Sequence, residues 1–538
     1  MRDNNLNTRN KIKLRTFIRR RSIFSMLSPN YYRFSMKNQI LYSLLFYFFI
    51  FPAWSLTTRL SVNDQGVEGN SNSFLLSSTA LSAEGRYVAF SSEASNLVAE
   101  DRNNTFDIFV YDTWLPNVIR VSVDAQGQEG NLTSQTPSLS ANGRYVAFSS
   151  FADNLVPGDT NQASDIFIYD MQTRSITRIV PPSGQESNGH SFHPSFSAEG
   201  NEIAFDSQAN NWVVDDDNPA SDIFVYHRQT DTVQRISTSG DCVHPHLSAN
   251  GRYVAFEAYG IFSQIVIHDL YTHQTRSLTP EANGNSFSPF ISSEGQYVAF
   301  TSEATNLVPH DVPVSDIFIQ NLYTNRIISL HVDDQASFPV LSEEGRYLVF
   351  SSYATHLVPH DTNGTVDVFR YEQETQQVER INLNNQHQES DLGPFPTPVA
   401  TSSSGCTIAF DSSATNLVSH DTNNSFDVFV HQIVTQSPIF DSSTMILDLP
   451  TVQVIGEKIY HAQLHLPSAY PSTFILHNIE PISFQNTSCA YFSPDTGLLY
   501  LPLVEVHHFG QNILYEVVMH RVSSSDSPQF EIVRINPR

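Results

Sequence analysis

Residues 85–90 read Gly-Arg-Tyr-Val-Ala-Phe, and residues 107–112 read Asp-Ile-Phe-Val-Tyr-Asp. Both phrases recur along the chain, and the glycine of the first opens seven copies, at Gly85, Gly143, Gly200, Gly251, Gly295, Gly345 and Gly405. Their Val, Ile, Tyr and Phe residues favour strands, and such continuous apolar runs are typical of sheets covered on both faces. Steps of 44 to 60 residues between the glycines predict a β-propeller in which each repeat forms one four-stranded blade.

The strands of one unit can be assigned in the second copy, where strand A is 136–140, strand B 145–150, strand C 165–170 and strand D lies around Arg178. The seventh copy has strands A to C but no strand D. The missing phrase stands before the first copy, since 57–62 matches 118–123. We therefore predict an all-β, seven-bladed propeller over 56–437 whose last blade is completed by the N-terminal strand. Six blades plus a spare unit is the alternative.

The phrases Ser-x-x-Gly-Arg-Tyr-Val-Ala-Phe-Ser-Ser and Asp-Ile-Phe-Val-Tyr-Asp resemble those of the TolB-type, WD-repeat-like β-propellers of exported bacterial proteins. The resemblance covers about 380 residues of the chain. It implies a propeller fold and, usually, an export signal. It implies no single activity, because such propellers serve as scaffolds, as partner-binding modules and occasionally as enzymes.

The charge of the chain is acidic and unevenly distributed. The 538 residues include 55 acidic and 29 basic residues, for a net charge of −26. Residues 1–54 hold ten of the basic residues and one acid, so the remainder carries a net charge of −35. This balance argues against a nucleic-acid partner. The three cysteines (Cys242, Cys406 and Cys489) form neither a disulfide framework nor a metal-binding pair, so we expect packing and hydrogen bonds to hold the fold.

The N-terminal residues 1–55 have the pattern of a basic N-region and a signal peptide. The apolar run Ile40–Phe51 spans twelve residues, which is short of the roughly 20 needed to cross a membrane. Small residues at Ala53 and Ser55 fit a cut after Ser55, and Met36 is the expected true start. We expect an exported protein, periplasmic or extracellular, with no transmembrane domain after cleavage. An uncleaved N-terminal anchor is the alternative.

The repeat stops before the C-terminal residues 438–538. There, the stretch 447–454 resembles 499–506. Each is followed by a stretch of alternating apolar and polar residues that contains tyrosine, and then by an apolar strand. The pattern predicts a duplicated small all-β domain, either an adhesive module or a cap on the propeller.

The long connections of each unit, B–C and D–A, leave the sheet on the same side, and loops on a rigid scaffold are where binding usually occurs. The B–C loop repeats the spacing Asp-x-Asn-x-x-x-Asp in five units: Asp101, Asn103 and Asp107; Asp159, Asn161 and Asp165; Asp216, Asn218 and Asp222; Asp361, Asn363 and Asp367; Asp421, Asn423 and Asp427. The fifth unit departs, with Asp311-Val312-Pro313, and the fourth lacks the loop.

This spacing has two explanations. Oxygen ligands at positions 1, 3 and 7 resemble part of a Ca²⁺ site, which needs about six to eight oxygens, but no bidentate acid follows at position 12. The alternative is an Asx turn, in which Asn and Asp bond to their own backbone. Calcium is the one cofactor that the spacing suggests.

Histidines form the second candidate site. His190 and His193 precede strand A of the third unit, and His244 and His246 hold the same place in the fourth. Other units place Thr136, Ser288, Phe338 and Thr397 before the equivalent proline. Strand A is innermost in a propeller, so these residues are predicted to ring the channel mouth. Two or three imidazoles there suit a transition metal, and ordinary polar lining is the alternative. No acid or base of convincing spacing accompanies the histidines.

The sequence therefore predicts a binding or scaffold protein rather than an enzyme. Its partner would be a protein or a glycan of the cell envelope or exterior, held by the face with the long acidic loops. The alternative is a metal-dependent carbohydrate-active enzyme using His193, His244 and His246, by fold-level analogy with propeller-shaped lyases. No nucleophile elbow, zinc-protease motif or phosphate-binding loop is present.

Overall fold

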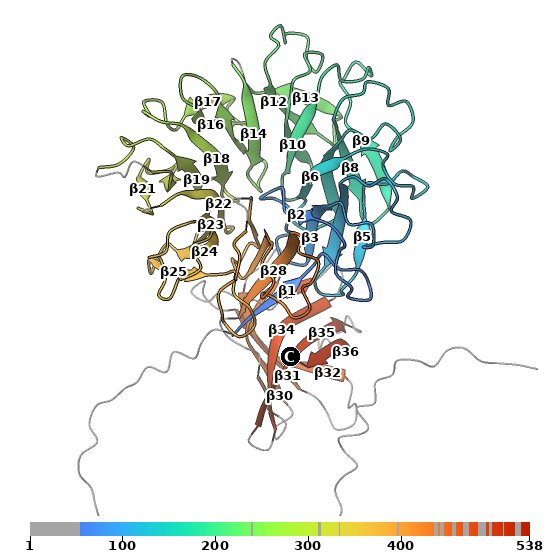
Figure 1. The fold of residues 1–538 in the computed structure, drawn as a ribbon, viewed down its shortest axis with the longest axis vertical. Coiled ribbons are helices and arrows are strands. Elements are labelled where there is room, and N and C mark those ends of the chain that lie inside the picture. Colours follow the sequence, from blue (N-terminus) through green and yellow to red (C-terminus); the bar gives the residue numbers. More distant parts are fainter. Residues whose placement is uncertain are drawn as a thin grey trace, which may run out of the picture.

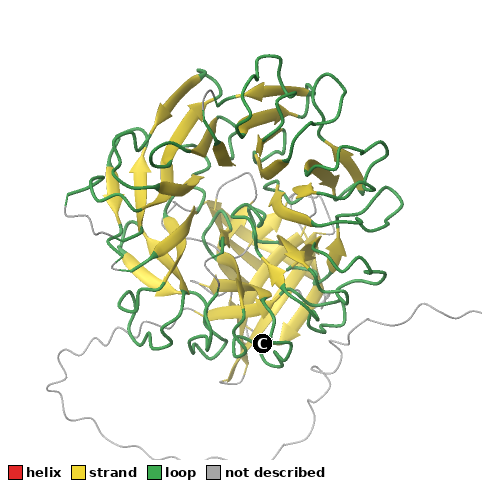
Figure 2. Ribbon diagram, turned by 45° about the horizontal axis from the view of Figure 1, so that its top comes forward, coloured by secondary structure: helices red, strands yellow, loops and turns green. Residues whose placement is uncertain are grey.

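The computed structural model describes residues 54–237, 240–309, 314–332, 334–394 and 397–434, together with the strands of the C-terminal region. These residues contain strands and no helix (Figure 2). Within them, nothing has the helical length and apolarity that crossing a membrane requires. Of the predicted signal peptide 1–55 and its alternative, the anchor, residues 1–53 lie outside the described residues, as does the Asp311-Val312-Pro313 stretch. Trp54 and Ser55, at the predicted cut, begin the first strand of the structure.

Seven four-stranded sheets are arranged in a ring (Figures 1 and 2). Six of them follow chain order, from inner strand A to outer strand D. They are blade 1, β2 (Ser73–Phe74), β3 (Tyr87–Ser92), β4 (Asp107–Asp112) and β5 (Val118–Arg120); blade 2, β6 (Ser134–Leu139), β7 (Tyr145–Ser150), β8 (Asp165–Asp170) and β9 (Ser175–Arg178); blade 3, β10 (Ser191–Phe196), β11 (Glu202–Ser207), β12 (Asp222–His227) and β13 (Thr232–Arg235); blade 4, β14 (Cys242–Leu247), β15 (Tyr253–Ala258), β16 (Gln264–Asp269) and β17 (Gln274–Ser277); blade 5, β18 (Ser286–Ile291), β19 (Tyr297–Ser302), β20 (Asp316–Asn321) and β21 (Ile327–Ser329); blade 6, β22 (Ala336–Leu341), β23 (Tyr347–Ser352), β24 (Asp367–Glu372) and β25 (Gln377–Arg380).

The seventh blade is built from both ends of the propeller sequence. Strands β26 (Ala400–Thr401), β27 (Thr407–Ser412) and β28 (Asp427–Val434) are completed by β1 (Trp54–Arg59), which pairs antiparallel with β28. The prediction of a seven-bladed propeller closed by its N-terminal strand is confirmed, and the six-blade alternative is wrong. Closure in this way leaves no open sheet edge between the first and last blades.

A ring of backbone hydrogen bonds joins the A–B turns of all seven blades at one end of the channel. In each bond the N–H of the first residue donates to the carbonyl of the second, at 2.8–3.1 Å: Ala83 to Ala141, Ala141 to Ala198, Ala198 to Ala249, Asn250 to Ser293, Ser293 to Glu343, Glu343 to Ser403, and Ser403 back to Ala83. The series closes on itself, which fixes the number of blades at this end.

Packing between blades explains the apolar residues of the repeat. Ala89, Ile108 and Val110 of blade 1 share one buried cluster with Val146 and Phe148 of blade 2. Every residue of β7 is buried, as expected for a strand covered on both faces. The conserved pattern of the repeat within this chain is therefore a packing requirement between neighbouring blades.

The Gly-Arg-Tyr residues that begin the repeated phrase make the contacts that hold together the side of the ring that bears the A–B and C–D turns. Arg86 Nη2 lies 2.7 Å from Asp112 Oδ2, at the end of strand C, and its guanidinium lies over the Tyr87 ring, 4.6 Å from the centroid. In the A–B turn of the neighbouring blade 2, Gly143 has a φ of 69°, and a Cβ there would lie 2.2 Å from the Tyr87 ring. Only glycine fits that turn against the neighbouring blade.

The C-terminal strands form one eight-stranded sheet: β29 (Ile439–Asp441), β30 (Ile446–Val454), β31 (Ile459–His465), β32 (Thr473–Pro481), β33 (Tyr491–Ser493), β34 (Leu498–His508), β35 (Gln511–Arg521) and β36 (Gln529–Pro537). The pairing repeats between β29–β32 and β33–β36. In each half the first short strand pairs in parallel with a strand of the other half, β29 with β34 and β33 with β30. Both long strands carry a bulge at a Leu-Pro step, after Leu449 and after Leu501.

This sheet contacts blades 1 and 7 (Figure 1). Trp114, in the C–D turn of blade 1, is fully buried and stacks on Tyr500 of β34 with ring centroids 5.1 Å apart. Leu498 and Val518 belong to the same cluster. Gln432 Nε2 of blade 7 donates a hydrogen bond to the Tyr500 hydroxyl at 2.9 Å.

One covalent link corrects the expectation that the fold has no disulfide support. Cys406, in the A–B turn of blade 7, is disulfide-bonded. Cys242 is a buried thiol, and burial raises its pKa to about 12. The remaining cysteine of the sequence, Cys489, lies outside the described residues. The spacing of the cysteines did not predict this disulfide, because cysteine is not part of the repeat and the propeller contributes only one of the two linked residues.

Candidate functional site at the channel mouth

A bulge interrupts the innermost strand of five consecutive blades. In blade 2, the β6–β7 register shifts between Gln135 and Ser138, and blades 3 to 6 shift at the equivalent place. Each bulge holds one residue with positive φ, followed by a proline: Thr136 at 50°, His193 at 51°, His244 at 54°, Ser288 at 53° and Phe338 at 53°. Residues with a Cβ rarely adopt this conformation, and such strain gathers at ligand sites.

The strained residues line a cavity of about 190 Å³ at the end of the channel opposite the A–B turns. Its wall also includes Glu257, His246, the prolines that follow four of the bulges (Pro194, Pro245, Pro289 and Pro339), and the segment 76–79 of blade 1. The cavity therefore has an apolar collar of proline rings around a few convergent polar groups, the usual composition of a small-ligand site.

Carboxylates stand behind the histidines, contrary to the expectation from the sequence. His193 Nδ1 lies 2.7 Å from Asp206 Oδ1, and His244 Nδ1 lies 3.2 Å from Glu257 Oε1. Each acid comes thirteen residues after its histidine, on the neighbouring strand B, at the place where Tyr-Val-Ala-Phe-Ser-Ser becomes Glu-Ile-Ala-Phe-Asp-Ser or Tyr-Val-Ala-Phe-Glu-Ala. That departure from the repeat was the signal available in the sequence.

The same arrangement recurs in other blades with different chemistry. Thr136 and Ser149 pair through their hydroxyls at 2.7 Å in blade 2. Thr397 Oγ1 donates to Asp411 Oδ1 at 2.6 Å in blade 7. Asp411 is fully buried, and burial raises its pKa to about 7. Thr397 and Asp411 are not among the cavity residues, and within the described residues the bulge itself occurs only in blades 2 to 6. Acids occupy this strand-B position in blades 3, 4 and 7.

The carboxylates also bind the next blade. Asp206 accepts the N–H of His244 at 3.3 Å, and Glu257 accepts the N–H of Ser288 at 2.8 Å. Burial alone would lower the pKa of His244, but the hydrogen bond and charge of Glu257 outweigh that effect and raise it. The acids therefore fix both the bulge backbone and the imidazole that projects from it.

The four predicted histidines are placed differently. His193 and His244 lie side by side in the mouth, with ring centroids 4.3 Å apart. His246 lies deeper, packed on Phe290 with centroids 3.8 Å apart, and burial lowers its pKa to about 3. His190 is not among the cavity residues, because it packs between two phenylalanines and its Nδ1 accepts the Ser164 N–H.

This geometry allows two kinds of chemistry. Because the Nδ1 atoms of His193 and His244 face carboxylates, each imidazole has its Nε2 left for a ligand. A carboxylate behind a histidine is the usual support of a metal-binding imidazole, and it also raises the basicity of a proton-transfer group. Three strand-B hydroxyls at the equivalent position, those of Ser91, Thr301 and Ser351, are buried and have no hydrogen-bond partner within the described chain.

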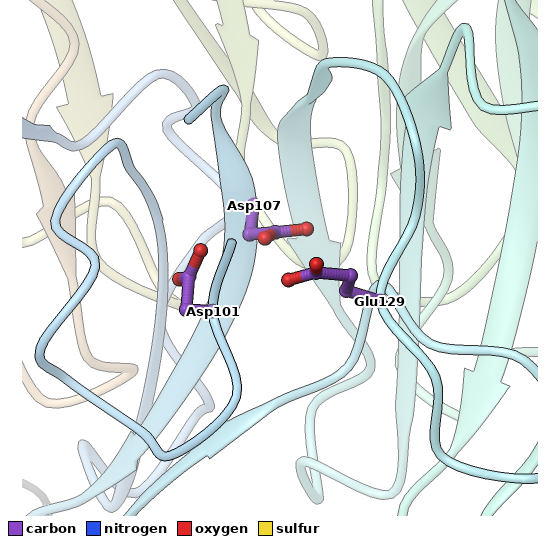
Figure 3. A group of neighbouring side chains, drawn as sticks. All are labelled: Asp101, Asp107 and Glu129. Atoms are coloured by element: carbon purple, nitrogen blue, oxygen red, sulfur yellow. The ribbon is translucent and has the colours of Figure 1, made fainter. Parts of the chain in front are cut away.

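The Asp-x-Asn loops hold an arginine. Asp101, Asp107 and Glu129 bring their carboxylates together (Figure 3), and Arg120 Nη1 lies 3.4, 3.2 and 2.9 Å from them. Arg120 Nη2 also donates to the carbonyl of Glu100 at 3.0 Å. Burial first, and then the charge of Asp107, raises the pKa of Asp101 to about 6.

The arrangement, which we call the arginine cage, recurs in four further blades. The caged residues are Arg178 with Asp159, Asp165 and Glu186; Arg235 with Asp216 and Asp222; Arg380 with Asp361, Asp367 and Glu389; and Arg59 with Asp421, Asp427 and Glu68. Blades 4 and 5 place Ser277 and Ser329 where the arginine stands elsewhere.

The loop asparagines make the Asx turn. Asn103 Oδ1 accepts the N–H of Thr105 at 3.0 Å, and its amide donates to Asp107 and to the carbonyl of Gly130, which leads to the next blade. The equivalent turn bond forms at Asn161, Asn218, Asn363 and Asn423. These loops therefore tie neighbouring blades together, and the hypothesis of calcium binding stays a prediction that a calcium titration of the melting temperature would test.

No family model matches the chain, and no curated protein matches it. Among solved structures, TolB from Acinetobacter baumannii is 17% identical over 58% of this chain, with a TM-score of 0.34, and the match spans 62% of that chain, less than two thirds of its length. Oligogalacturonate lyase in complex with manganese is 12% identical, covering 70% of this chain and 93% of that one, with a TM-score of 0.48. The β-propeller domain of the Trilobed protease from Pyrococcus furiosus is 10% identical, covering 68% and 98%, with a TM-score of 0.43. At these identities the likenesses concern the fold alone.

Proposed function

We propose that this chain is an exported binding protein that holds part of a partner at the channel mouth, on the side of the long loops. The partner would be a protein or a glycan of the cell envelope or exterior. The observation that carries the proposal is the mouth itself, where five blades keep a strained residue in place around one cavity. Strain of about 1–3 kcal/mol per residue is retained where the surroundings enforce it, most often at ligand sites.

Two further features support the proposal. The disulfide at Cys406 suits an oxidising compartment, outside the cytoplasm. The cages neutralise five arginines on the loop side, whereas Asp153, Asp215 and Asp241 remain exposed there, so the rim around the mouth is acidic. A partner that approaches this rim with a basic or hydroxyl-rich surface would meet a complementary charge.

The test compares the wild-type chain with a His193→Ala/His244→Ala variant, each immobilised and exposed to solubilised cell-envelope extract. We expect the wild type to retain a defined partner that the variant loses at least tenfold. Arg102→Ala, an exposed position in a loop of blade 1, is the control and should retain the partner. Equal retention by all three proteins would contradict a role for the mouth.

A metal-dependent carbohydrate-active enzyme of the lyase type is the second candidate function. The two adjacent carboxylate–histidine pairs favour it, with His193 and His244 as ligands and the deeper His246 as a third. Metal analysis after incubation with Mn²⁺ or Zn²⁺ and removal of the free ion is the test. This candidate predicts one bound ion per wild-type chain and none in the double histidine variant, so equal metal content in both proteins would reject it.

A further inference from the structure

A second recess lies between blades 4 and 5, at the turn side of the ring and therefore at the opposite end from the channel mouth. Its volume is about 370 Å³, and its lining includes Tyr253, Asp269, Gln274, Arg276 and Tyr323. Tyr323 is 64% exposed, and Tyr271, in the neighbouring C–D turn, is 84% exposed. Exposed aromatic side chains beside a recess mark a surface that binds something.

The two tyrosines occupy a position that already serves as a docking point elsewhere in the ring. Asx turns hold Trp114, Tyr271 and Tyr323 in the same way, two residues after the end of strand C, with the backbone N–H of each donating to Asp112, Asp269 or Asn321 at 2.9–3.0 Å. In blade 1 the aromatic ring is fully buried against the C-terminal sheet. In blades 4 and 5 the equivalent rings are mostly exposed. The guanidinium of Arg252 lies over the Tyr271 ring, 5.9 Å from its centroid, and the exposed remainder of both rings is available for an external ligand.

Arg276 gives the recess its charge. Arg252 is held by Asp269, with Nη2 and Oδ2 2.8 Å apart, whereas Arg276 is exposed and its Nη1 donates only to the amide oxygen of Asn325, at 3.2 Å. Within the described chain no carboxylate lies within ion-pair distance of Arg276. In a protein of net charge −26, a guanidinium without a carboxylate partner that lines the same recess as the exposed Tyr323 favours an anionic ligand.

We propose that this recess, which we call the tyrosine groove, binds an acidic saccharide chain. Sugar rings would stack on Tyr271 and Tyr323, whose flat faces accept the C–H edges of a pyranose at little cost in conformational entropy. A sugar carboxylate or sulfate would pair with Arg276. Thr272, Gln274 and Thr275 supply donors and acceptors for hydroxyl groups. The centre of a protein-docking site is apolar and depleted of charge, whereas this lining places charged and hydrogen-bonding side chains beside tyrosine rings, a combination that favours a saccharide instead.

The experiment uses the full chain and isothermal titration calorimetry with three probes: alginate oligomers, which are carboxylated, heparin oligomers, which are sulfated, and neutral dextran oligomers. We expect one or both acidic oligomers to bind and dextran not to bind. Tyr271→Ala/Tyr323→Ala should weaken binding at least tenfold. Arg276→Gln should weaken it severalfold and reduce its dependence on salt.

Tyr353→Ala is the matched control, since Tyr353 is an exposed tyrosine (40%) at the start of a B–C loop, on the other side of the ring. It should bind the acidic oligomers like the wild type. The His193→Ala/His244→Ala variant should also bind them normally, which separates this proposal from that for the channel mouth. Absence of binding to both acidic oligomers, equal binding of dextran, or unchanged binding by the tyrosine variant would overturn the proposal. So would a change of oligomeric state in the tyrosine variant, which would assign the groove to a contact between copies of the chain.

Discussion

Arg120 shows how single residues join the blades of this ring. Its guanidinium is the only cation that the described residues place among Asp101, Asp107 and Glu129, and two of those carboxylates are almost inaccessible to solvent. Arg120→Met would leave three carboxylates together without a counter-charge. We expect the free energy of unfolding to fall by about 3 kcal/mol, measured by urea denaturation at pH 7.

The control for that prediction is Arg102→Met in the same loop. The Arg102 side chain is 73% exposed and pairs only with the exposed Glu100, so its loss should change stability by about 0.5 kcal/mol or less. Similar losses for the two variants would show that the cage contributes no more than a surface ion pair. Added Ca²⁺ that rescued Arg120→Met would show instead that the carboxylates take a metal once the arginine is removed.

Asp411 predicts a dependence of stability on pH. Burial raises the pKa of its carboxyl from 3.8 to about 7 in the folded chain. Between these values the folded state binds a proton that the unfolded state has released, so the contribution of Asp411 to stability falls as the pH rises from 4 to 7. From pH 5 to pH 8 the wild type should lose about 2 kcal/mol more than Asp411→Asn. Parallel stability curves for the two proteins would contradict the raised pKa.

At the scale of elements, β1 closes the ring by completing blade 7. It pairs along its whole length with β28, and its Arg59 fills the cage of blade 7. A chain that begins at Ser61 should therefore melt at a temperature lower by on the order of 10 °C, as followed by circular dichroism. A chain that begins at Leu56, the expected mature end, keeps 57–59 and should melt near the wild type. Equal melting temperatures would mean that blade 7 is stable with three strands.

The strands and their order could be predicted from the sequence, because each blade packs between its neighbours in the same way and therefore uses the same residue types at the same positions. The contents of the loops could be predicted only in part. The spacing of Asp101, Asn103 and Asp107 indicates a turn, but Arg120 joins them from another strand and Glu129 from the next connection, so spacing could not identify the cation. Asp206 and Glu257 escaped notice for the same reason, since strand pairing, rather than proximity in sequence, places them behind the histidines.

At the scale of the whole molecule, the two sides of the ring have different chemistry. The loop side carries the channel mouth, the caged arginines and an acidic rim. The turn side carries the arginine–tyrosine pairs, the contact with the C-terminal sheet through Trp114, and the tyrosine groove two to three blades away from that contact. A partner bound at the mouth and a saccharide bound at the groove would therefore not compete for the same surface, and the ring would hold them on opposite faces.

The disulfide at Cys406 gives a prediction for the complete chain. The sequence has three cysteines, of which Cys406 is oxidised and Cys242 is a buried thiol. A disulfide within one chain uses two of them, so the protein, purified from an oxidising compartment and denatured without reductant, should show one reactive thiol in a colorimetric assay and three after reduction. Reduction should also lower the melting temperature, because cutting such a link releases the unfolded chain and typically costs about 2–4 kcal/mol. Three thiols before reduction would show that the chain carries no disulfide. A single thiol that persists in Cys242→Ser would place it on another cysteine.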